Sequence, residues 1–154
     1  MVKRFNNPLL RRIFFLRYLP LALFAGVKLV LLEANKCEVS IPFKWMTKNP
    51  FKSMYFAAQS MAAEFSTAVL LVNQIEKSGA NLALIIVSMK ADFLERATEK
   101  VLFKCHVDHT LELAVTKAID TGEPVTVELS SKGVDINGNH VAQFWFTWSL
   151  KLRS

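Results

Sequence analysis

The chain of 154 residues is long enough to bury a core, and we expect one domain over residues 1–154. Hydrophobic residues make up 52% and charged residues 21%, a composition that excludes a disordered chain. The net charge of +6 favours anionic partners, a class that includes phosphates, anionic lipid and nucleic acid.

Residues 1–24 predict a basic, helical extension. Apolar residues recur at helical spacing from Leu9 to Phe14, and Pro20 predicts a kink or a restart of the helix. Several Lys and Arg residues precede the first acid, Glu33. Such a helix either packs across the sheet or at a dimer interface, or makes peripheral contact with a membrane surface. The uninterrupted apolar core and small-residue cleavage site of a secretory signal are missing.

Residues 27–43 alternate between apolar and polar side chains and predict two strands around a turn at residues 34–36. Cys37 lies in this pattern and Cys105 in a similar one further on, and neither has metal-binding spacing with the three histidines. We therefore expect two reduced, buried thiols in a cytoplasmic protein, with no metal.

Residues 49–78 form the central-helix region. Asn49 is suited to cap a helix, with Pro50 in its first turn and Gly79 as its terminator; Ser53 is a second possible cap. The helix is apolar nearly all round, which predicts that other structure wraps it.

Glu64 is the only formal charge between Met54 and Val72. Burying an unpaired charge costs several kcal/mol, so this carboxylate needs either a function or a partner, such as a lysine, Tyr55 or Gln59. Two windows, 13–32 and 54–72, have the length of a membrane span, but their charged residues make spanning costly. We expect a buried helix instead.

The remaining chain predicts a strand over 81–93 that is covered on both sides, a strand over 100–107, a helix over 108–121 and a hairpin over 125–152. One face of the last strand carries Ala142, Phe144, Phe146, Trp148 and Leu150. A single sheet can bury a long apolar helix on several sides only if it curls around the helix. The pattern therefore predicts the α+β class.

The stretch WMTKNPFKSMYFAAQSMAAE, residues 45–64, resembles the motif region of hotdog-fold thioesterases. ATEKVLFKC, TGEPVTVELSSKGVD and VAQFWFTWSLK resemble a branch catalogued as a domain of unknown function, and the resemblance covers residues 25–152. It implies a hotdog fold, a curved antiparallel sheet wrapped around one central helix. It also implies hydrolysis of an acyl thioester of coenzyme A or acyl-carrier protein, in a homodimer or homotetramer that binds ligand between subunits.

The similar phenylacetyl-thioester hydrolases carry a loop Asn, then His-Gly-Gly, then an acid nine residues after the His. Here Tyr55 takes the place of the His, Phe56 and Ala57 those of the glycines, and Glu64 that of the acid, while Asn49 stands near the loop Asn. The spacing of the acid is kept, whereas the His and both glycines are replaced.

This resemblance implies that Glu64 acts as general base or nucleophile. Asn49 either orients water or the thioester oxygen, or only caps the helix. Backbone N–H groups near the helix start form the oxyanion hole. The residues expected to bind substrate are Ser53, Met54, Tyr55, Phe56, Ala57, Gln59 and Met61. Possible contacts for carrier phosphates are Lys44, Lys48, Lys52, Lys90 and Lys100.

Coenzyme A enters as part of the substrate, and no other cofactor is expected. The replaced His-Gly-Gly motif keeps open a different class of function, a non-catalytic hotdog protein that binds acyl groups or lipid. Dehydration is set aside because no histidine lies in the motif region. Nucleic-acid binding is not expected, since no stacking-and-basic motif is present.

Overall fold

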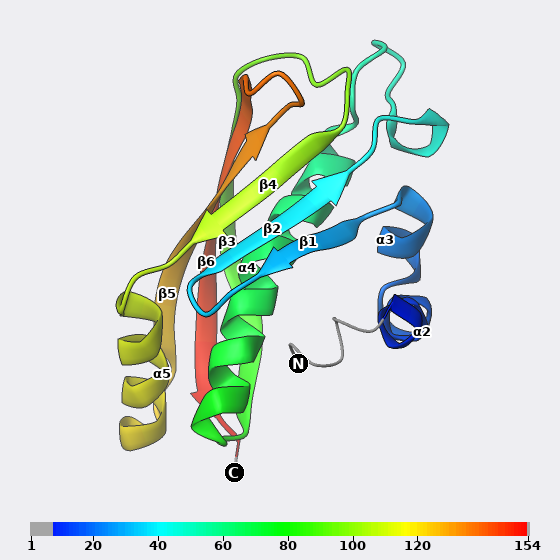
Figure 1. Ribbon diagram of the computed structural model, residues 1–154. Coiled ribbons are helices and arrows are strands. Elements are labelled where there is room, and N and C mark those ends of the chain that lie inside the picture. The colour runs from blue at the N-terminus through cyan, green and yellow to red at the C-terminus, as the bar shows by residue number, and fades with distance from the viewer. Residues whose placement is uncertain (1–7, 154) are drawn as a thin grey trace.

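A curled antiparallel sheet surrounds one long helix in the computed structural model, which describes residues 8–153 (Figure 1). The strands follow the order β1-β2-β4-β5-β6-β3, and every neighbouring pair is antiparallel. The strands are β1 (Lys28–Leu32), β2 (Lys36–Ile41), β3 (Leu82–Phe93), β4 (Val101–His106), β5 (Val125–Val134) and β6 (His140–Leu152). The helices are α2 (Pro8–Tyr18), α3 (Pro20–Ala25), the short 3-10 helix η1 (Trp45–Thr47), α4 (Phe56–Ser78) and α5 (Thr110–Thr121). The expected α+β architecture is confirmed.

The inner face of the sheet is built by alternation along its longest strand. On β6, the side chains of Ala142, Phe144, Phe146, Trp148 and Leu150 are all buried, as the sequence predicts. Since successive residues of a strand point to opposite faces, this row lines the concave side, where α4 lies. The two cysteines face one another across β2 and β4, and both are free and buried, which confirms the expected burial of these thiols.

Helix α4 is wrapped because its surface is apolar on several sides. Its few hydroxyl groups are satisfied internally: Ser66 and Ser131 share a hydrogen bond of 2.8 Å, and the Trp148 indole donates to the Thr67 hydroxyl at 3.1 Å. The ring of Phe65 lies 5.1 Å from that of Phe15 on α2, which therefore closes one flank of α4. These bonds satisfy the hydroxyl groups of Ser66, Thr67 and Ser131 in the core.

The start of α4 corrects the sequence prediction. The helix begins at Phe56 after the cap position Tyr55, and not after Asn49. The Asn49 carboxamide oxygen accepts the backbone N–H groups of Phe51 (3.0 Å) and Ser53 (3.2 Å), so the side chain stabilises a turn instead of the helix. A left-handed residue, Lys52 with φ of 60°, completes this turn. The predicted helix end is confirmed, because Gly79 follows in the left-handed conformation with φ of 71°.

The amino-terminal segment also follows the prediction, because the chain restarts its helix at Pro20. Residues 1–7 of the expected extension lie outside the described part of the chain. The window 13–32 is divided among α2, α3 and β1. Among residues 8–153, no helix is both long and apolar enough to cross a membrane.

Strand β3 differs from the expectation of cover on both sides. It forms the end of the sheet, with β6 as its only neighbour among the described strands. Its exposed apolar side chains include Ile85, Val87 and Met89. The apolar run of β3 therefore lies at the end of the sheet with several of its side chains exposed, and the expected cover on both sides is wrong.

Candidate active site

Glu64 opens into a cavity of about 460 Å³ between α4 and the sheet, which we call the Glu64 cavity. Five elements or their flanks supply its walls: α3, η1, the first half of α4, β3 and β6. The lining residues are Leu21, Ala25, Met46, Tyr55, Ala57, Ala58, Ser60, Met61, Glu64, Ile86, Met89 and Phe146. The walls are almost wholly apolar, and small alanine side chains on α4 leave the space.

The Glu64 carboxylate has no hydrogen bond or ion pair with any side chain that the structure describes. Neither Tyr55 nor Gln59 binds it, so the alternative of a carboxylate paired with them is not supported. Burial raises the pKa of the Glu64 carboxyl to about 7, because an apolar environment disfavours the charged form. A carboxyl with this pKa exchanges protons near neutral pH, as general acid–base chemistry requires.

A second cavity of about 600 Å³, the α4-entry cavity, lies between the loop that precedes α4 and the loop that follows β3. Of the predicted site residues, Asn49, Ser53, Met54, Phe56 and Gln59 line it. Of the remaining ones, Ala57, Met61 and Glu64 line the Glu64 cavity. Tyr55 lines both cavities and therefore lies where they meet.

Gln59 lines the α4-entry cavity and carries an unsatisfied polar atom. The side chain is only 4% exposed, and its amide nitrogen donates a long 3.4 Å hydrogen bond to the Met54 carbonyl. Its Oε1 atom is buried and receives no hydrogen bond from the described residues. A buried acceptor without a donor costs about 1–3 kcal/mol, so this atom is suited to accept a hydrogen bond from a bound molecule.

The beginning of α4 supplies hydrogen-bond donors. The N–H groups of Ala58 and Gln59 bind the Tyr55 carbonyl, while no side chain in the described part of the chain caps the first turn. The N–H groups of Phe56 and Ala57 therefore remain available to an anionic or carbonyl oxygen, which the helix dipole also favours.

Asn49 lies away from the Glu64 cavity and is already engaged. Its Oδ1 accepts two backbone N–H groups, and its Nδ2 donates to the Ser53 hydroxyl at 3.1 Å. This makes Asn49 a stabiliser of the loop that shapes the α4-entry cavity. Lys48 and Lys52 flank it and are exposed.

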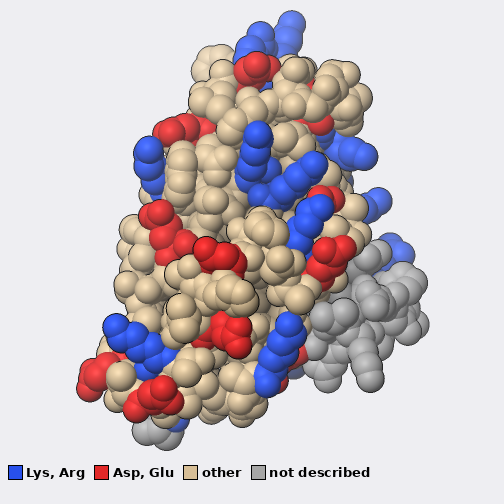
Figure 2. All heavy atoms as spheres, turned by 60° about the vertical axis from the view of Figure 1, so that its left-hand side comes forward, with Lys and Arg blue, Asp and Glu red and all other residues tan. Residues whose placement is uncertain are grey.

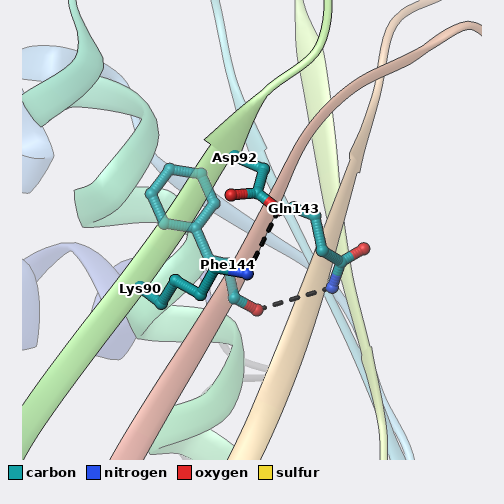
Figure 3. A network of polar contacts seen from close by, with 4 residues as sticks. All are labelled: Lys90, Asp92, Gln143 and Phe144. Atoms are coloured by element: carbon teal, nitrogen blue, oxygen red, sulfur yellow. Dashed lines mark hydrogen bonds and ion pairs between the residues drawn. The ribbon is translucent and has the colours of Figure 1, made fainter.

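Lys90 points away from both cavities. Its ammonium lies 3.5 Å from the Asp92 carboxylate (Figure 3). The same ammonium lies 4.5 Å from the centre of the Trp145 ring. Beside this pair, the Gln143 amide donates to the Phe144 carbonyl at 3.4 Å. Lys90 alternates with Met89, which lines the Glu64 cavity, and so it lies on the opposite face of the sheet.

Sequence reasoning did not identify the walls contributed by other elements: Leu21, Ala25, Met46, Ile86, Met89 and Phe146. In the sequence these residues have the pattern of ordinary core positions. Only the curvature of the sheet places them next to α4. Within residues 8–153, no group of three His, Cys, Asp or Glu side chains is placed to hold a metal ion.

One family matches residues 10–150, and it is described as a domain of unknown function, DUF4442. The chain belongs to the DUF4442 family. No curated protein is similar enough in sequence to match.

Solved structures resemble this DUF4442 chain over most of its length. A Pseudomonas aeruginosa protein of unknown function, described as a probable thioesterase, is 18% identical with a TM-score of 0.81, over 96% of this chain and 97% of its own. A thioesterase from Haemophilus influenzae is 13% identical with a TM-score of 0.70, over 91% of this chain and 88% of its own. These similarities show that the fold is the hotdog fold that the motif region predicts.

A thioesterase enzyme from Staphylococcus aureus is 16% identical with a TM-score of 0.69, over 86% of this chain and 98% of its own. Structures of that protein include one variant with a glutamine replaced by alanine and another with a glutamate replaced by alanine.

Proposed function

We propose that this DUF4442 protein hydrolyses an acyl thioester, with Glu64 as the catalytic residue. The observation that carries the proposal is a carboxylate that has no partner among the described side chains and a pKa of about 7, in an apolar cavity of about 460 Å³. The walls suit an acyl chain, and structural neighbours are described as thioesterases. In the Staphylococcus aureus thioesterase, the two substituted positions lie fifteen residues apart, which is also the separation of Asn49 and Glu64.

In the general-base route, the Glu64 carboxylate removes a proton from water while the water oxygen bonds to the thioester carbon. The carbonyl oxygen becomes an oxyanion that accepts hydrogen bonds from backbone N–H groups at the start of α4. The C–S bond then breaks, and the departing thiolate takes the proton from Glu64, giving a carboxylic acid and a thiol. In the nucleophile route, the Glu64 carboxylate attacks the thioester carbon, the C–S bond breaks, and the thiolate leaves and takes a proton from water. Water then hydrolyses the mixed anhydride, which releases the carboxylic acid and restores the Glu64 carboxylate.

A second copy of the chain completes the site in this proposal. Ala57 and Glu64 are seven residues apart, or about 10 Å along a helix, and the first-turn N–H groups point away from Glu64. A glutamate side chain spans only part of that distance, so one thioester does not contact both groups of the same α4. The open, apolar edge of β3 borders the Glu64 cavity and suits strand pairing with a partner that supplies the other group.

The carrier arm fits the α4-entry cavity in this scheme. Coenzyme A and acyl-carrier protein both present a phosphorylated arm that contains amide groups. The arm offers N–H donors to Gln59 Oε1 and phosphate to Lys48 and Lys52, which are exposed beside the cavity. The acyl group then lies in the Glu64 cavity, on the other side of Tyr55.

Steady-state hydrolysis of acyl-coenzyme A substrates of varied chain length tests the proposal. We expect Glu64→Gln to lower kcat by at least about 100-fold, which is typical of losing a general base, with folding intact. Glu123→Gln, at an exposed position, is the matched control and should leave the rate unchanged. Equal rates for wild type and Glu64→Gln would refute the assignment.

Mass spectrometry of the purified protein separates hydrolysis from non-catalytic binding. A co-purified acyl compound together with no turnover of any thioester would favour the binding protein. Single-turnover hydrolysis in ¹⁸O water tests the nucleophile route in which water attacks the Glu64 carbonyl of the anhydride, because only this route leaves ¹⁸O in the Glu64 carboxyl and releases an unlabelled acid.

A further inference from the structure

Helix α2 exposes apolar side chains on the face that points away from the core. Phe15 is buried against Phe65 of α4, whereas Ile13 and Leu16, on the other side of the helix, are 52% and 61% exposed. Helical spacing places Arg12 and Arg17 on either side of these two residues, and both arginines are exposed. An apolar stripe flanked by arginines is unfavourable in water and typical of helices at a membrane surface.

The exposed apolar surface continues beyond α2. Leu21 and Phe24 of α3 are 69% and 57% exposed. The 3-10 helix η1 adjoins α3, since the Lys44 ammonium donates to the Phe24 carbonyl at 2.8 Å, and Trp45 in η1 is 79% exposed. In Figure 1 these three elements lie along one side of the molecule. We call this surface the amino-terminal patch: Ile13, Leu16, Leu21, Phe24 and Trp45, with Arg12 and Arg17.

The half of the chain that builds the amino-terminal patch is strongly basic. Residues 1–63 contain ten Lys and Arg residues but only two acids, Glu33 and Glu38, whereas residues 64–154 contain nine basic and eleven acidic residues. The face that carries α5 is different, because acidic and basic side chains are interspersed on it (Figure 2). The positive charge of the protein is therefore concentrated in the half of the chain that builds the patch.

We infer that the amino-terminal patch docks on the surface of an anionic lipid bilayer. The apolar side chains would enter the interface, and the arginines would contact lipid phosphates. A second copy is the competing occupant of an apolar face. Pairing two copies through this patch would bring two sets of basic residues together, which their repulsion opposes, whereas an anionic bilayer complements them.

Docking would also place the substrate entrance near the lipid. Leu21 belongs to both the amino-terminal patch and the wall of the Glu64 cavity, and Met46 of η1 lines the same cavity. An acyl chain that leaves the bilayer would therefore meet the cavity directly. This consequence rests on the proposed function, whereas the docking itself does not.

Co-sedimentation of the full chain with vesicles tests the inference. Vesicles contain either phosphatidylcholine alone or equal parts of phosphatidylcholine and phosphatidylglycerol. We expect binding to the mixed vesicles, and a loss of at least about fivefold per basic residue removed in Arg12→Gln and Arg17→Gln. Raising the salt from about 0.1 M to about 1 M shortens the Debye length from roughly 10 Å to roughly 3 Å and should release the protein.

Apolar substitutions test the other half of the inference. The double variant Leu16→Asp, Phe24→Asp should lose binding by at least about tenfold, since charged side chains are costly in the interface. Leu113→Asp is the matched control, because Leu113 on α5 is similarly exposed at 67% and lies outside the patch. Circular dichroism verifies that each variant is folded, and a blue shift of Trp45 emission on mixed vesicles, lost in Trp45→Ala, reports entry into the interface.

Three outcomes would overturn the inference. One is absence of binding to mixed vesicles at low salt. Another is a loss of vesicle binding in Leu113→Asp that equals the loss in the patch variants. The third is a change of oligomeric state in sedimentation velocity for Leu16→Asp, Phe24→Asp with unchanged vesicle binding, which would assign the patch to a second copy. None of these readouts depends on thioester hydrolysis, so a failure of the proposed function is recognised separately.

Discussion

At the scale of single residues, Glu64 links stability to pH. The carboxyl has an ordinary pKa of 4.5 when unfolded and about 7 when folded, so the folded state binds more protons between these values. Stability should therefore fall as the pH rises from about 4.5 to about 7 and then stay level, at a total cost of about 3 kcal/mol. We expect Glu64→Gln to match wild type near pH 4 and to exceed it near pH 8, measured by urea unfolding. A pH-independent difference would contradict this origin.

The same residue predicts the pH profile of catalysis. A general base must be ionised, so kcat/KM should rise with pH and level off above the pKa of about 7. Initial rates over a range of pH measure this, with substrate hydrolysis in buffer subtracted. A profile that is flat from about pH 5 to about pH 9 would exclude Glu64 as the base.

Replacing Gln59 should affect stability and substrate binding in opposite directions. Gln59→Met keeps the volume and removes the unsatisfied Oε1, so the unfolding free energy of the ligand-free protein should stay level or rise by about 1 kcal/mol. KM for acyl-coenzyme A should rise, because the carrier arm loses an acceptor, whereas a thioester of a simple alkyl thiol should be unaffected. Lower stability and equal effects on both substrates would indicate that Gln59 only packs.

At the scale of elements, β3 predicts how two copies of the chain would pair. It is long and apolar with one open edge, and Val87, at a register shift, is 54% exposed. Val87→Lys should weaken strand pairing between copies, since edge lysines oppose it. Sedimentation velocity should then show a smaller species with lower activity, while Leu113→Lys serves as the control. A wild-type protein that is already monomeric would contradict the shared site.

At the scale of the whole molecule, the sequence predicts the helices and strands well. It predicts less well which elements lie next to one another. Alternation identified β6 and its inner row, and Gly79 marked the end of α4, because these features follow from local geometry. The start of α4 was misplaced, since an Asn-Pro pair favours a turn and a helix cap equally well, and only the contacts of Asn49 distinguish them. The walls of the Glu64 cavity come from five regions of the chain, and no local pattern connects them.

The two opposed thiols of β2 and β4 have a practical consequence. They are the only sulfhydryl groups in the chain, both are buried, and burial raises the pKa of the Cys105 thiol to about 12, which leaves almost no reactive thiolate. A cysteine introduced at Leu16 or Val87 would thus be the sole site for a maleimide dye or spin label. Fluorescence quenching from the lipid phase, and label-to-label distances between copies, become measurable in an otherwise native background.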